Sequence, residues 1–258
     1  EILLEANPDS AYILLNEVKT PDRLNERQFA RWCMLYCRAA DKLFKDMLYT
    51  EQLDRALAWC KNHGTAEQRA WMGLYLGRSY VKDKLFIPAM KAYSDALSLA
   101  KEKYLYDVAG YICSYMADLY TYTGQRSEER RKFEEAAEFF KQAGNERSYA
   151  FALRDVAKTW AFDDSLSLAL HYMLIADSVI TRFQDLRGIS SISNGLGNIY
   201  DLMGDVEKAR TYYSRSLSSD TMDQVPSYLA LSDLYYNESH LDSARYYLEK
   251  AATPTSNS

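Results

Sequence analysis

The sequence has 258 residues, 48% of them hydrophobic and 26% charged, a composition typical of a chain that folds around a core rather than of a disordered one. Its formal net charge of -5 supplies no positive field to attract nucleic acid or anionic lipid. No apolar run approaches the roughly 20 residues that a transmembrane helix requires, and the 3 histidines leave few groups for acid–base catalysis near neutral pH. We therefore expect this segment to contact neither nucleic acid nor a membrane.

Residues 1–29 are predicted to form a partial N-terminal repeat and a connector. The segment PDSAYILLNEV from Pro8 is similar to LDSARYYLEKA from Leu241, and this alignment places Ala11 opposite Ala244. We expect the N-terminal segment to be the second half of a repeat like those that follow.

Beyond these residues, the dominant pattern is a repeat with a period of forty. Segments of the same pattern open with a small residue at Gly77, Ala117, Ala157 and Gly197. An aromatic residue follows each of them three positions later: Tyr80, Tyr120, Trp160 and Tyr200. A second small residue follows after nineteen positions: Ala96, Ala136, Ala176 and Ser216.

The register extends forty residues upstream to Cys37 and thirty-five residues downstream to Ser232. No linker-like stretch interrupts it. We therefore predict a single solenoid over residues 1–258 with six repeats: 30–69, 70–109, 110–149, 150–189, 190–224 and 225–258.

The small residues predict hairpins of two antiparallel helices, because two helices approach closely only where one of them presents Gly, Ala or Ser. Gly124 and Gly204 are expected in the turns within hairpins. Thr65 and Gln68 form a capping-box pattern before a first helix. Potential caps precede three of the second helices: Ser127, Asp205 and Asp242.

This pattern resembles the tetratricopeptide repeat (TPR) family, which implies an all-α fold, a right-handed superhelix of antiparallel helix hairpins. The motifs Leu76-Gly77-x2-Tyr80 and Leu196-Gly197-x2-Tyr200 carry the resemblance, although the family's leading Trp and closing Pro are mostly absent. The period also suits HEAT or armadillo repeats, but the spacings inside each hairpin follow the TPR offsets. The additional residues fall between hairpins and would lengthen two helices by a little under one turn each, as in the long TPRs of kinesin light chains and bacterial regulators.

Two features that resemble chemical sites have a structural interpretation. Gly195 and Gly197 lack the preceding strand and the third glycine of a dinucleotide-binding loop, so we assign them to helix packing. Cys33, Cys37, Cys60 and His63 offer ligand types for zinc, but the register of the first two favours buried small residues. We predict no metal site and no cofactor.

No nucleophile, base and orienting group occur together, so we predict no enzymatic activity. His171 and His240 have no such motif around them. A hydrolase-type enzyme remains a remote alternative, which turnover dependent on either histidine would support.

The resemblance implies that a ligand contacts the first helix of each repeat, on the concave wall of the solenoid. Carried over by position, this places the candidate binding residues at Arg38, Arg78, Asp118, Arg154, Lys158, Asn194, Asn198 and Asp233. The basic positions suit a protein or peptide with an acidic segment or a free carboxylate. Self-association into a homo-oligomer is left open.

We therefore expect a non-catalytic scaffold that binds proteins or peptides, the ligand-sensing or assembly part of a larger bacterial protein. The alternative is the sensor domain of a membrane-linked transcriptional regulator. The segments EANPDSAYILLNEV and NHGTAEQRAWMGLYLGRSY look like TPR regions of bacterial envelope proteins, which implies a periplasmic or lipid-anchored location with the targeting segment outside this sequence.

Overall fold

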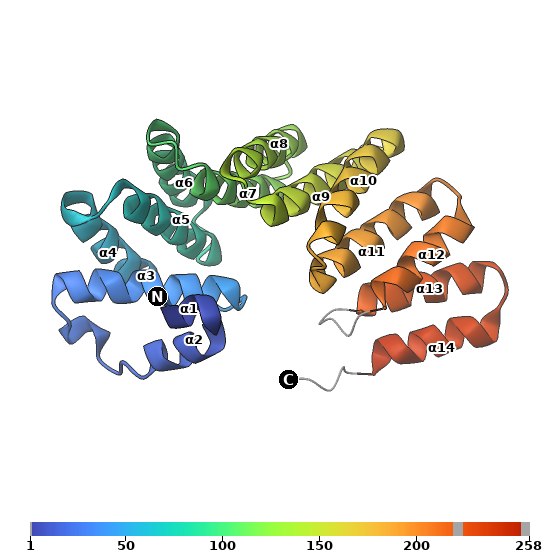
Figure 1. Ribbon diagram of the computed structural model, residues 1–258, viewed down its shortest axis with the longest axis horizontal. Coiled ribbons are helices and arrows are strands. Elements are labelled where there is room, and N and C mark those ends of the chain that lie inside the picture. The colour runs from blue at the N-terminus through green and yellow to red at the C-terminus, as the bar shows by residue number, and fades with distance from the viewer. Residues whose placement is uncertain (1, 219–223, 254–258) are drawn as a thin grey trace. The chain divides into compact units, whose positions relative to one another are not determined.

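The structure is a computed structural model that describes residues 2–218 and 224–253 (Figure 1). Within these ranges the regular structure is helical and contains no strand. The helices are α1 (Ile2–Ala6), α2 (Pro8–Asn16), the 3₁₀ helix η1 (Pro21–Arg23), α3 (Glu26–Lys42), α4 (Thr50–His63), α5 (Ala66–Lys82), α6 (Phe86–Glu102), α7 (Tyr106–Thr123), α8 (Arg126–Ala143), α9 (Glu146–Phe162), α10 (Leu166–Arg182), α11 (Leu186–Leu202), α12 (Val206–Ser216), α13 (Val225–Asn237) and α14 (Leu241–Ala252).

The chain divides into two compact units, residues 1–143 with α1 to α8 and residues 144–258 with α9 to α14. In each unit, consecutive helices pair and pack against one another, from α3 with α4 to α13 with α14. The first helices also contact each other, α3 with α5 and α5 with α7 in one unit, and α9 with α11 and α11 with α13 in the other. The predicted all-α fold of helix hairpins is confirmed. The continuity of one solenoid across both units stays a prediction.

The helices are longest where the sequence repeats every forty residues. From α5 to α11 they contain 17 or 18 residues, whereas α12, α13 and α14 contain 11, 13 and 12. Each additional residue lengthens a helix by about 1.5 Å, so the extra residues of the longer repeats extend the paired surfaces.

The small residues of the repeat lie where a first helix meets its second helix. A Cβ atom on Gly77 would lie 2.3 Å from the ring of Tyr93, and one on Gly197 would lie 2.4 Å from the ring of Tyr213. Both tyrosines are buried. Each aromatic ring therefore occupies the space that the missing side chain leaves, which brings the two backbones together.

The turns within hairpins contain a residue in the left-handed region. Gly124 and Gly204 occupy it with φ of 71° and 78°, as the sequence predicted. The equivalent residues in the other turns carry side chains: Phe44, Lys84, Asp164 and Ser239. A side chain disfavours this conformation, so these turns depend on the helices that they join.

The predicted caps are partly correct. Thr65 and Gln68 form a complete capping box at α5, and Asp205 caps α12 by accepting from the backbone N–H of Lys208. Ser127 and Asp242 are wrong as caps, because they lie in the first turns of α8 and α14. These helices begin two residues earlier than caps at residues 127 and 242 would require. The acidic side chain at position 242 still favours the positive end of the helix dipole.

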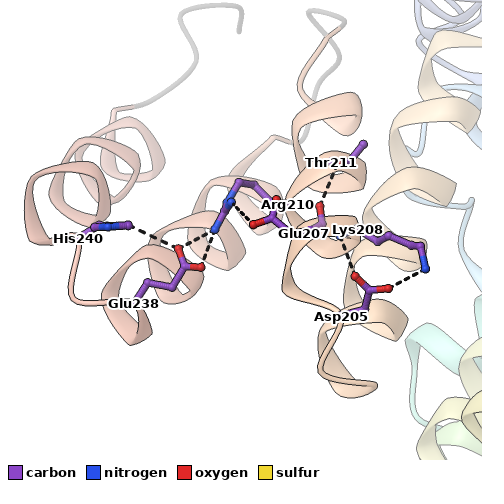
Figure 2. Close-up of polar contacts among 7 residues, drawn as sticks. All are labelled: Asp205, Glu207, Lys208, Arg210, Thr211, Glu238 and His240. Atoms are coloured by element: carbon purple, nitrogen blue, oxygen red, sulfur yellow. Dashed lines mark hydrogen bonds and ion pairs between the residues drawn. The ribbon is translucent and has the colours of Figure 1, made fainter.

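In the unit of residues 144–258, an arginine joins the last two hairpins (Figure 2). Arg210 on α12 donates from Nη2 to both carboxylate oxygens of Glu238, at 2.7 and 2.6 Å, just after α13. Its Nη1 donates to Glu207 at 3.0 Å, and its guanidinium lies 5.2 Å from the ring centroid of Tyr235. His240 lies 3.5 Å from Glu238 on the other side. This bidentate pair fixes the second helix of one hairpin to the turn of the next.

Candidate functional site

In the unit of residues 1–143, polar contacts among three side chains connect the first helices, and we call this group the polar bridge. Arg78 on α5 donates from Nη1 to Oδ1 of Asp41 on α3. Tyr115 on α7 donates to the same oxygen at 2.9 Å, and the Arg78 guanidinium lies 4.4 Å from the Tyr115 ring centroid. Only 19% of the Arg78 side chain is exposed. Three successive first helices are thus joined through one carboxylate.

The protonation of this bridge follows from its burial. Burial first, and then the charge of Asp41, raises the pKa of Tyr115, so the phenol keeps its proton and remains a donor. Burial opposes the charged form of Arg78, but the carboxylate of Asp41 favours it, and the pKa of Arg78 is raised overall. Arg78 therefore already binds a carboxylate of its own chain.

The other two predicted residues of this unit flank the bridge. Arg38 on α3 is partly buried, and Asp118 on α7 is exposed. Burial raises the pKa of Tyr93, while the charges of Arg78 and Asp118 act on the same phenol in opposite directions. Arg78 and Asp118 are on the adjacent first helices α5 and α7.

In the unit of residues 144–258, the basic end of the first-helix face is on α9. Arg154 binds the adjacent Asp155 with two hydrogen bonds of 2.9 Å and donates to Ser191 on α11, also at 2.9 Å. Lys158 lies 3.3 Å from Asp155, and 57% of its side chain is exposed. One carboxylate thus faces two cations, and Lys158 is the more exposed of the two.

Amide groups follow on α11. Asn194 donates from Nδ2 to Ser227 on α13 at 2.9 Å. The exposed Asn198 accepts from the phenol of Tyr213 at 2.8 Å. Arg154 and Asn194 therefore hold neighbouring first helices together.

The acidic end of the same face is on α11 and α13. Asp233 is exposed on α13, and Asp201 lies one turn after Asn198 on α11. Burial and the charge of Asp233 both raise the pKa of Asp201, which shows that the two carboxylates are close. The face changes from basic through amide to acidic across three adjacent helices.

The sequence did not indicate several partners of the predicted residues. Ser191 and Ser227 were missed because they bond across to a neighbouring helix, and a pattern within one helix does not show which side chains of the next helix lie opposite. Asp155 could have been found, since it is adjacent to Arg154 on the same helix. Asp201 could have been found, since it is one helical turn from Asn198.

The cysteines are buried as free thiols. Burial raises the pKa of Cys37 and of Cys113 to about 12 each, so both thiols stay protonated at neutral pH. His63 stacks on Trp59 and lies 3.2 Å from the Trp59 carbonyl oxygen. Among residues 2–218 and 224–253, no group of three or more His, Cys, Asp and Glu side chains has the arrangement of a metal site.

The structure also locates the glycine run and the two other histidines that the sequence analysis considered. Gly195 lies inside α11, where a Cβ would be 2.6 Å from Met173 Cε, so both glycines of this run serve helix contacts. His171 is exposed on α10, and His240 is the N-terminal flanking residue of α14. Within the described parts of the chain, no helix is both long and apolar enough to cross a membrane.

Comparison with known proteins identifies one repeat by its sequence. A family profile described as tetratricopeptide repeat matches residues 191–221, which contain most of α11 and all of α12. A search of the curated proteins gives no significant match.

Several solved structures share the fold. BtubC (BKLC) from P. vanneervenii superposes with a TM-score of 0.66 at 21% identity, over 78% of this chain and 85% of its own. The apo form of RapI gives 0.70 at 18% identity, over 95% and 70%. NprR in complex with its cognate peptide NprX gives 0.63 at 16% identity, over 97% and 74%. At these identities the likeness is one of fold.

Proposed function

We propose that the chain is a tetratricopeptide-repeat protein that acts as a non-catalytic scaffold and binds a protein or peptide on the first helices of the unit formed by residues 144–258. The observation that carries this proposal is the charge order on that face. Lys158, Asn198 and Asp233 are exposed on α9, α11 and α13, at corresponding positions of three adjacent helices. We name this row the 158–233 face.

The other unit is a weaker candidate. Its corresponding cation, Arg78, is mostly buried and already bound to Asp41. A ligand carboxylate there would have to displace an internal one and leave Asp41 uncompensated, which is costly for a partly buried charge. Lys158 is more accessible, because 57% of its side chain is exposed, and its partner Asp155 is also bound by Arg154.

The dimensions of the 158–233 face suit a short extended peptide. Neighbouring helices pack about 8–10 Å apart, so the distance from α9 to α13 is about 16–20 Å. An extended chain of five or six residues covers this distance at about 3.3 Å per residue. The ligand would place an acidic side chain or its terminal carboxylate at Lys158 and a basic residue near Asp201 and Asp233. The fold shared with NprR, which was solved with a bound peptide, is consistent with this use.

A library of octapeptides with varied charge order tests the proposal. We expect the protein to select peptides that are acidic at one end and basic about five residues away. Lys158→Glu should lower the affinity for the selected peptides at least tenfold, because the new carboxylate repels the acidic end of the peptide. The control is Lys250→Glu, an equal charge change on the exposed surface of α14. Equal loss in both variants, or no selection by charge order, would contradict the proposal.

We further propose that the scaffold is the sensing or assembly part of a larger bacterial protein of the cell envelope. The support for this role is the sequence resemblance. Detection of the native protein in the periplasmic or membrane fraction of cells is the expected result, and its recovery in the cytoplasm alone would contradict it.

A further inference from the structure

A cavity of ≈ 370 Å³ lies among α4, α5 and α6, within the unit of residues 1–143 and away from the 158–233 face. Gly73 and Leu76 of α5 line it together with Leu57 of α4 and Ala92 and Leu99 of α6. Its volume falls in the range of small-ligand sites, about 300–1,000 Å³, and such sites combine an apolar lining with a few polar groups.

The next repeat shows what fills the equivalent space. Forty residues after Ala92 is Lys132 on α8, whose side chain is only 8% exposed. Glu135 holds its ammonium group at 2.6 Å and also binds Lys101. The side chain of Phe139 stands where the earlier repeat has Leu99. The earlier repeat thus lacks the long side chain that closes this space in its neighbour.

One end of the cavity is positive. Lys61, near the end of α4, and Arg69, in the first turns of α5, both line it. The two helices are joined there by residues 64–65, so both cations lie at the same end. Arg69 Nε is buried and has no hydrogen-bond partner. A buried donor without an acceptor is costly, and an anionic ligand would satisfy it.

The acidic residues that line the cavity already have hydrogen-bonding partners within the protein. Asp95 pairs with Lys91 at 3.1 Å, and Asp54 accepts from the phenol of Tyr80 at 3.2 Å. Glu102 lies outside the lining and pairs with Lys103 at 2.7 Å, and this contact, with a smaller contribution from the charge of Arg69, lowers the pKa of Glu102. The end of the cavity that Lys61 and Arg69 line therefore attracts an anion.

From this arrangement we infer a second binding site, one that takes a small molecule with an apolar body and a carboxylate head. The apolar body occupies the space beside Gly73 and Ala92, as the stem of Lys132 does in the next repeat. The carboxylate is bound by Arg69 and Lys61.

Octanoate is the probe, titrated into the full chain by calorimetry, with octanol and octylamine as ligands of similar length and different charge. We expect saturable binding of octanoate, at least tenfold weaker binding of octanol, and no binding of octylamine. In NMR spectra, nuclear Overhauser contacts should join the octanoate chain to the methyl groups of Leu57, Leu76 and Leu99. Preference for octylamine, or contacts to other leucines, would overturn the inference.

Two variants test the site itself. Ala92→Lys introduces the residue found at the equivalent position of the next repeat, with Asp95 at the position equivalent to Glu135, and should abolish octanoate binding. Arg69→Gln removes the buried cation and should weaken binding at least tenfold, which keeps the test valid if Ala92→Lys does not fold. Lys141→Gln, an exposed charge change on α8, is the matched control and should leave binding unchanged. Octanoate affinity that is unaltered by Arg69→Gln would refute the site.

Discussion

The ring of Tyr213 lies against Gly197 so closely that a Cβ atom at residue 197 would be 2.4 Å from the nearest ring carbon. Gly197→Ala therefore overpacks the contact between α11 and α12. We expect the overpacking cost, about 1–3 kcal/mol, to exceed the gain in helix propensity of about 1 kcal/mol. The thermal midpoint should fall.

The control for this variant is Gly195→Ala on the same helix. There the new Cβ meets the thioether end of Met173, 2.6 Å from Cε, and this flexible side chain can move aside. We expect Gly195→Ala to be tolerated or mildly stabilising. Equal destabilisation by the two alanines would show that the aromatic contact is not what requires glycine.

Acidification should lower the stability of the unit of residues 1–143, because it protonates Glu135. Burial would raise the pKa of Glu135, but its bonds to Lys101 and Lys132 hold the pKa below the ordinary value of 4.5. A lowered folded-state pKa contributes stability above the ordinary value, and this contribution is lost as the pH falls through the folded-state pKa. Glu135→Gln should therefore cost about 3 kcal/mol at pH 7, because it leaves Lys132 buried without a counter-charge, and the cost should shrink as the pH falls through the folded-state pKa.

The measurement is chemical denaturation of both proteins at several pH values. The double variant Glu135→Gln/Lys132→Met is the control, and it should recover most of the loss at pH 7, since an apolar side chain replaces the buried charge. A loss of the same size at pH 3 and pH 7 would contradict the assigned role of the pair.

Asp201→Asn should have the opposite pH dependence. Burial and Asp233 raise the pKa of Asp201, so its charge destabilises the folded state above the folded-state pKa and ceases to do so once the carboxyl is protonated. We expect the thermal midpoint to rise at pH 7 by about 1–2 °C, as for a solvent-screened charge pair. At pH 3 the variant and the parent should melt together. A lower midpoint at pH 7 would mean that the two carboxylates do not repel one another.

Lys84→Gly should stabilise the turn between α5 and α6. Lys84 has a φ of 60°, which costs a residue with a side chain about 1–2 kcal/mol relative to glycine. The greater entropy of glycine in the unfolded chain offsets part of this. Lys103→Gly is the control, since Lys103 has a φ of -103° and gains nothing from glycine. We expect a higher midpoint for the first variant only, measured by differential scanning calorimetry.

The parts of the fold that follow from one helix or one hairpin could be predicted from the sequence. Gly124 in its turn and Gly197 at its contact are examples, because their spacing in the chain determines their place. The left-handed Lys84 could not, since lysine carries no signal for this conformation and the flanking helices impose it. The same holds for the bridge from Arg78 to Asp41, because two neighbouring repeats must be placed side by side before the pair is visible.

The 158–233 face is tested most directly by NMR titration of the full chain with a charge-ordered octapeptide selected from the library. We predict amide shift changes around Lys158, Asn198 and Asp233, on the adjacent helices α9, α11 and α13. Shift changes confined to the second helices α10, α12 and α14 would contradict the account.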